Sequence, residues 1–196
     1  GWHNDRGFRR FRRKYKSVSR QNGKTFENGI TGTYISGFGG YQYGKLFTVA
    51  TKHAQAKLAW EEIAKFIDID PELGELYKVQ EYKTLITNNV TNCTIEALSK
   101  ERSLDDGFRG IFNSVDEIHQ HKDNSIYKAI YNGTRALDET LTSMITTRGR
   151  DLNGFCHEMD TYCLNILNGS AAAEDFFVDI YTLDPDDDYF DESIWI

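Results

Sequence analysis

Segments typical of β-strands alternate with segments typical of α-helices along most of this 196-residue chain. Such alternation favours a mostly parallel sheet that helices cover on both faces. We expect strands at residues 15–19, 45–50, 83–88, 93–98, 111–115, 141–146 and 176–183, and helices at 24–36, 53–67, 124–137 and 152–167. The sequence therefore predicts one α/β domain with a well-buried core.

Charge is unevenly distributed along the chain, although the net charge is only −7. Residues 1–25 contain nine Lys or Arg against one Asp, whereas residues 174–192 contain nine acids and no base. The basic end suits anions, and we interpret residues 184–196 as an acidic connector. The three cysteines form no CxxC pair, which fits a reducing cytoplasm. No run approaches the ~18 apolar residues that a membrane span needs, so we expect no membrane partner.

The sharpest local pattern is V-S-R-Q-N-G-K-T at residues 18–25. It fits the phosphate-binding loop G-x-x-x-x-G-K-[ST], except that Val18 replaces the first glycine. The pattern follows an expected strand and opens an expected helix, where backbone N–H groups and the helix N-terminus can surround a polyphosphate. Lys24 would reach the β- and γ-phosphates, and the Thr25 hydroxyl would bind Mg²⁺. The predicted nucleotide-binding residues are Ser19, Arg20, Gln21, Asn22, Gly23, Lys24 and Thr25.

Two adjacent carboxylates end the strand expected at 111–115. Asp116 could hold Mg²⁺, and Glu117 could orient and deprotonate the water that attacks a γ-phosphate. Asn113 and Ser114 make this strand more polar than a buried central strand usually is.

A third strand tip, at Thr146 and Thr147, carries hydroxyls that could sense the γ-phosphate. The three patterns follow one another along the chain, and each falls at the carboxyl end of an expected strand. Open α/β sheets place their ligands at that edge. We therefore predict one site that contains all three patterns.

Several segments together resemble the ATPase domain of terminase large subunits from tailed bacteriophages. The segments that carry the resemblance are Gly1-Trp2, residues 9–12, residues 19–25, Ala50-Thr51 with Gln55-Ala56 and Trp60, Asp106-Gly107, residues 116–119, residues 145–149, Ile180-Tyr181, Leu183-Asp184, Asp187-Asp188 and Trp195. They occur in the family's order and cover essentially the whole chain. Replacement of the first loop glycine is typical of terminases, so Val18 agrees with the resemblance.

The resemblance implies a P-loop NTPase fold of the additional-strand type, with an extra strand between the phosphate-loop strand and the acidic-pair strand. It implies an Mg²⁺-dependent ATPase motor that moves double-stranded DNA into the procapsid. Within it, Glu117, Lys24 and Arg20 would be catalytic, Thr25 and Asp116 would bind the metal, and Thr146 and Thr147 would couple hydrolysis to movement. Arg102 and Arg109 are candidates for an arginine supplied to a neighbouring subunit.

The resemblance also sets expectations for the surroundings of the domain. Residues 1–183 would be the ATPase domain, with an adenine-gripping segment before Gly1 and an RNase H-like nuclease domain after residue 196. The fragment itself would not cut DNA. Its partners would be ATP, double-stranded DNA, the small terminase subunit, the portal protein and further copies in a ring of five. It would act in the bacterial host cytoplasm, at the portal vertex of the procapsid.

Three alternatives remain open at this stage. Glu117, His119, His121 and Asp123 could form a metal-dependent hydrolase, because they are all ligand types at alternate positions. A nucleic-acid-binding module could instead use the basic residues Arg6, Arg9, Arg10, Arg12, Arg13, Lys14 and Lys16. Within the P-loop class, a helicase-like ATPase is the third alternative.

Overall fold

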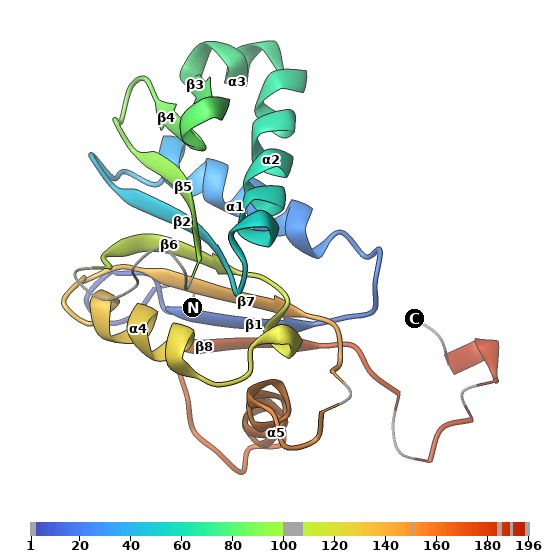
Figure 1. Cartoon of the computed structure of the whole chain (residues 1–196). Helices are drawn as coiled ribbons and strands as arrows, with labels where there is room; N and C mark the ends of the chain where they lie inside the picture. The colour runs from blue at the N-terminus through green and yellow to red at the C-terminus, as the bar shows by residue number, and fades with distance from the viewer. Residues whose placement is uncertain (1–2, 100–107, 150, 184–185, 189, 195–196) are drawn as a thin grey trace.

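The computed structural model describes residues 3–99, 108–149, 151–183, 186–188 and 190–194. Strands and helices alternate through most of them (Figure 1). The α-helices are α1 (Lys24–Phe38), α2 (His53–Ile69), α3 (Pro71–Leu76), α4 (Ser125–Thr134) and α5 (Phe155–Leu167). The strands are β1 (Arg13–Ser17), β2 (Lys45–Ala50), β3 (Tyr77–Gln80), β4 (Leu85–Asn88), β5 (Thr94–Ser99), β6 (Gly110–Val115), β7 (Leu141–Thr146) and β8 (Phe176–Ile180). Three short 3₁₀ helices are η1 (Glu81–Lys83), η2 (Ile118–Gln120) and η3 (Glu192–Ile194).

The eight strands form one sheet in the order β3-β4-β5-β2-β6-β7-β1-β8. Strands β5, β2, β6, β7, β1 and β8 run parallel to one another, whereas β4 pairs in antiparallel fashion with both β3 and β5. Strand β7 lies between β1 and β6, so one strand separates the strand before the phosphate loop from the strand before the acidic pair. The predicted mostly parallel sheet and its additional strand are confirmed.

Helices cover both faces of the sheet, as its alternating side chains require. Helices α1 and α2 pack on one face, with Ile35, Trp60 and Ile63 in the core. Helices α4 and α5 pack on the other face, with Ile130 and Met159 in a second core. Strand β2 serves both cores, because consecutive residues of a strand point to opposite faces.

Most predicted boundaries agree with the structure to within two or three residues. Helix α1 ends at Phe38, two residues beyond the predicted end, and Gly39 caps it. Gly37 lies in the last turn, where a β-carbon would come within 2.5 Å of the Tyr77 hydroxyl. The strand expected at 83–88 begins only at Leu85, because residues 81–83 form η1.

Helix α3 and strand β3 were not predicted at all. Asp70 caps α3 by accepting hydrogen bonds from the backbone N–H groups of Glu72 and Leu73, and Pro71 occupies the first turn. Both are ordinary helix-start signals, in a helix too short to show apolar periodicity.

No helix in the described part of the chain has the length and apolar character needed to cross a membrane.

Candidate active site

The loop between β1 and α1 lies at the carboxyl end of the parallel strands. Gly23 adopts a left-handed conformation, with φ of 66°, and caps α1. Gln21 is also left-handed, at φ of 64°. The Asn22 amide donates to the Ser19 hydroxyl at 2.8 Å and to the Arg20 carbonyl at 3.1 Å, which braces the turn. The loop therefore has the tight shape that cradling a phosphate group requires.

Lys24 is buried beside the predicted phosphate-binding loop. Its ammonium group donates to the Val18 carbonyl at 3.1 Å and to the Ser19 carbonyl at 2.9 Å. The side chain thus folds back over the loop, and both acceptors are neutral carbonyls. A phosphate oxygen in the loop would offer a stronger, charged acceptor.

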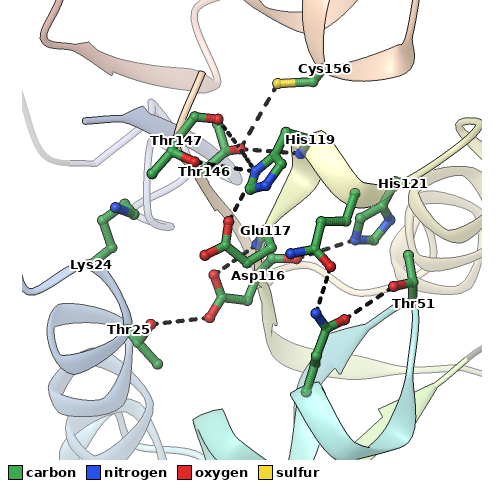
Figure 2. A network of polar contacts seen from close by, with 12 residues as sticks. Lys24, Thr25, Thr51, Asp116, Glu117, His119, His121, Thr146, Thr147 and Cys156 are labelled. Carbon is green, nitrogen blue, oxygen red and sulfur yellow. Dashed lines mark hydrogen bonds and ion pairs between the residues drawn. The ribbon is translucent and has the colours of Figure 1, made fainter. Parts of the chain in front are cut away.

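Thr25 joins the loop to the acidic pair. Its hydroxyl donates to Asp116 Oδ2 at 3.1 Å, although the residues lie 91 positions apart in sequence (Figure 2). Burial, and then the charge of Glu117, raise the pKa of Asp116, while hydrogen bonds from Thr25 and the Glu117 backbone N–H oppose that rise. An ionised Asp116 is therefore poorly compensated in this structure, and a nearby cation would offset its cost.

The donor set at this point fits Mg²⁺. A hydroxyl and a carboxylate are hard oxygen ligands, and Mg²⁺ usually takes one or two of these from the protein, with water and phosphate oxygens completing its coordination. In the described residues, no cluster of three or more His, Cys, Asp or Glu could hold a metal ion. The four residues of the metal-dependent hydrolase alternative therefore do not form such a cluster. His121 instead points its Nε2 toward the Asp116 carbonyl at 3.2 Å.

Glu117 directly follows Asp116, the candidate metal ligand, and adopts a left-handed conformation with φ of 52°. Its backbone N–H donates to Asp116 Oδ1 at 2.7 Å. Such a conformation is costly for a residue with a β-carbon and is typical of functional sites. The side chain lies beside His119 and the tip of β7, where Thr146 and Thr147 are both buried.

A cleft of about 510 Å³ brings these parts together. Residues 20–26, Gln55, Leu58, Ala59, Glu62, Asp116, Glu117 and Gln120 line it. Arg20, one of the candidate catalytic residues, is exposed and is part of this lining. Thr146 and Thr147 are not part of the lining and reach the site through His119.

Sequence reasoning gave no role to two residues of the cleft. The Gln55 amide donates to Gln120 Oε1 at 2.5 Å, and the Thr51 hydroxyl donates to Gln55 Oε1 at 3.2 Å. These bonds link the start of α2 to η2 across the cleft. Glutamine carries no local pattern that predicts such a contact, so only the fold reveals it.

The structure describes only one of the two candidates for an arginine that acts on a neighbouring subunit. Arg102 lies outside the described residues. Arg109 is exposed immediately before β6, at the amino end of the strand whose carboxyl end carries Asp116. At about 3.3 Å per residue, the strand puts it roughly 20 Å from its own acidic pair. Arg109 therefore lies too far from its own acidic pair to contact it.

The basic residues near the N-terminus are used largely within the domain. Four of them hold β1 and its neighbours in place through ion pairs and hydrogen bonds. These contacts are Arg12 with the carbonyls of Thr134 and Leu137, Arg13 with Asp175, and Lys14 and Lys16 with Glu27. Most of the basic side chains that a nucleic-acid-binding module would use are therefore already paired within the domain.

The parallel sheet, the phosphate loop, the acidic pair and the intervening strand define a P-loop NTPase of the additional-strand type. The family model of the terminase large subunit ATPase domain matches residues 1–164. The chain therefore belongs to the family of terminase large subunit ATPase domains.

Similar proteins and structures agree with this family. Protein YmfN of Escherichia coli (strain K12) is 33% identical over 95 residues, which are 48% of this chain and 21% of YmfN. The HK97 bacteriophage large terminase superposes with a TM-score of 0.77 at 20% identity, over 91% of this chain and 37% of that one. The Thermus phage P74-26 large terminase ATPase domain gives a TM-score of 0.66 at 16% identity, over 87% and 75%. At such identities these structures show a shared fold, and the chain spans about two fifths of the HK97 protein.

Proposed function

We propose that this domain binds and hydrolyses MgATP, and that this hydrolysis drives double-stranded DNA into a phage procapsid. The observation that carries the proposal is the Thr25–Asp116 hydrogen bond of 3.1 Å, with Glu117 as the next residue. It joins the loop suited to phosphates, the oxygen ligands suited to Mg²⁺ and a candidate base in one cleft. Membership of the terminase family supports the same activity.

Each side chain has a role that follows from its position. Lys24 would leave the loop carbonyls for the β- and γ-phosphates, and residues 19–23 would surround them with backbone N–H groups. Thr25 and Asp116 would hold Mg²⁺, which neutralises charge developing on the phosphates. Glu117 would orient the attacking water and accept its proton. Arg20 would contact the phosphates from the edge of the cleft.

We also propose a wider assembly, which the family membership supports. A homo-oligomeric ring, five copies by analogy, would let Arg102 or Arg109 of one copy complete the site of the next. The ring would sit on the portal protein at the procapsid vertex in the bacterial cytoplasm, and the small terminase subunit would deliver the DNA. Residues 184–196 would connect this domain to a nuclease domain.

The Glu117→Gln variant of the complete large subunit tests the chemical role. We expect MgATP turnover to fall by about 10² to 10⁴, because the general base is lost, while ATP affinity changes little. Glu62→Gln is the matched control, since Glu62 lines the same cleft with an exposed side chain. Normal hydrolysis by Glu117→Gln would contradict the assignment.

A second experiment separates packaging from the helicase-like alternative. With portal-bearing procapsids, the active protein should protect linear double-stranded DNA from added nuclease when ATP is present. The strands of that DNA should stay paired. Strand separation without protection would favour the helicase-like ATPase.

A further inference from the structure

The His119 imidazole lies between the acidic pair and the tip of β7 (Figure 2). Its Nδ1 is 2.9 Å from Glu117 Oε2, 3.2 Å from Thr146 Oγ1 and 3.4 Å from Thr147 Oγ1. The His119 backbone N–H also donates to Thr146 Oγ1, at 3.2 Å. One ring nitrogen thus contacts both the candidate base and the two hydroxyls of the neighbouring strand.

A count of protons assigns the role of this nitrogen. The Thr146 hydroxyl donates its single proton to the Thr147 carbonyl at 2.7 Å, so toward His119 it can only accept. An ionised Glu117 carboxylate also can only accept. These two neighbours therefore favour the tautomer with the hydrogen on Nδ1, for which Thr146 and Glu117 compete.

The direction of the ring N–H favours the threonine hydroxyls over Glu117. With Nδ1 as the protonated nitrogen, its geometry satisfies hydrogen bonds to Thr146 Oγ1 and, at a longer distance, to Thr147 Oγ1. Among the described residues, Glu117 Oε2 is buried and accepts no hydrogen bond, although it lies 2.9 Å from the same nitrogen. A buried carboxylate oxygen without a hydrogen bond is unfavourable. A small rotation of either side chain would transfer the hydrogen bond from Thr146 to Glu117.

Packing holds His119 where this exchange can take place. Ile118, at the start of η2, is fully buried and anchors the segment. Gly149, which follows the β7 tip, packs so closely that a β-carbon there would lie 3.0 Å from His119 Cβ. A displacement of the β7 tip is therefore transmitted directly to the imidazole.

We propose that His119 is a positioning residue whose single Nδ1 hydrogen, shared between Thr146 and Glu117, makes the position of the catalytic carboxylate depend on the tip of β7. This inference rests on the proposed ATPase function. With Nδ1–H on Thr146, His119 does not hold the Glu117 carboxylate, which can then turn toward the attacking water. With Nδ1–H on Glu117, that oxygen is occupied and the carboxylate is held toward η2.

Substitution of His119 in the complete large subunit tests the inference. In His119→Ala, kcat for MgATP should fall by about ten- to a hundredfold, because the carboxylate loses its position, while KM and the affinity for a fluorescent ATP analogue stay within about threefold. His119→Asn, whose amide nitrogen can replace Nδ1–H, should recover most of kcat. The control is His157→Ala on the exposed side of α5, which should behave as wild type.

A double-mutant cycle with Thr146→Val tests the link between the two strands. If one hydrogen bond connects the residues, the double variant should lose little more kcat than the more impaired single variant. Fully additive losses, or an effect on KM alone, would overturn the inference. Thermal melting checks that each variant is folded, and if His119→Ala fails to fold, His119→Asn and Thr146→Val carry the test.

The controls keep failure of this inference separate from failure of the proposed function. If Lys24→Ala abolishes turnover but His119→Ala matches wild type, the positioning role is wrong and the ATPase assignment stands. If Lys24→Ala leaves turnover unchanged, the ATPase assignment itself is wrong, and the inference falls with it.

Discussion

The Thr25 hydroxyl donates a hydrogen bond to Asp116 Oδ2 over 3.1 Å, across the edge of the sheet. This contact brings the first residues of α1 against the residue that directly follows β6. Because β7 lies between β1 and β6, the loop and the acid are positioned by two strands that are not neighbours. The cleft between them is the result.

Thr25→Ala should raise the Mg²⁺ concentration needed for half-maximal ATP turnover. The change removes one oxygen ligand and the hydrogen bond to Asp116, a loss of about 1 to 3 kcal/mol, which corresponds to roughly five- to a hundredfold. Thr25→Ser keeps the hydroxyl and should need nearly the wild-type concentration. A Mg²⁺ titration of steady-state turnover measures both, and equal requirements in the two variants would argue against Thr25 as a ligand.

Asn28 should be important for stability, because it joins α1 to two central strands. Its amide donates to Ser114 Oγ at 2.8 Å and its carbonyl accepts from Ser143 Oγ at 2.7 Å, all in the buried core. Asn28→Ala would leave both hydroxyls without this partner and lower the free energy of unfolding by about 2 to 3 kcal/mol. Urea denaturation measures this loss.

Asn165→Ala, at an exposed position of α5, is the control for that experiment. It should change the free energy of unfolding by less than about 0.5 kcal/mol. Equal effects of the two substitutions would show that the buried network contributes nothing.

Gly23→Ala should affect both stability and nucleotide binding. Gly23 has a φ of 66°, and a β-carbon there would meet no atom within 4 Å, so the cost comes from the backbone conformation alone. That cost is about 1 to 2 kcal/mol.

Gly169→Ala is a matched control for Gly23→Ala, because Gly169 has a φ of 72° and open space, but lies after α5 and away from the cleft. Both variants should lose similar stability in thermal or urea denaturation. Only Gly23→Ala should also weaken ATP binding, as measured by titration with a fluorescent analogue. Equal binding by both variants would contradict the role of the loop.

Glu139 should make folding stability depend on acid pH. Partial burial opposes ionisation, but hydrogen bonds from the Tyr41 hydroxyl and the Arg9 backbone N–H, both 2.6 Å long, lower the pKa of Glu139 below its usual value of about 4.5. The ionised form is therefore favoured in the folded state. Its contribution is fully present above the unfolded pKa and is lost as pH falls through the lower folded pKa.

The Glu139→Gln variant isolates this contribution. The difference in free energy of unfolding between wild type and Glu139→Gln should be largest at neutral pH and should shrink as the pH falls below about 4.5. Asp138→Asn, an exposed neighbour, is the control. A difference that stayed constant with pH would show that Glu139 gains nothing from these hydrogen bonds.

The parts of the fold with strong periodicity were predictable from sequence. Strands β2 and β7 have the predicted limits, because each is a β-branched and apolar run bounded by loops. Helix α2 shows its buried face at helical spacing, through residues such as Trp60 and Ile63. Helix α3 and strand β3 were missed, since six and four residues are too few to show a period.

The site was predictable where a local pattern carries the chemistry. The loop and the acidic pair could be found because phosphate and Mg²⁺ binding require particular residues at particular spacings. The sequence did not explain why β6 is so polar for a buried strand. In the structure, Ser114 Oγ accepts a hydrogen bond from the Asn28 amide, and the Asn113 amide donates to the Gly110 carbonyl at 3.3 Å. The hydrogen bonds of Gln55 with Gln120 and of His119 with Thr146 join distant segments, which no local pattern encodes.

The proposal that this domain hydrolyses MgATP is tested most directly by the rate of MgATP hydrolysis. This rate is measured for the complete large subunit with and without Lys24→Ala. The Lys24 ammonium group lies at the loop, where it donates hydrogen bonds of 3.1 and 2.9 Å to the Val18 and Ser19 carbonyls. We expect steady turnover by the wild type and a loss of both turnover and nucleotide binding in the variant. Equal turnover by the two proteins, or no binding of nucleotide by either, would contradict the proposal.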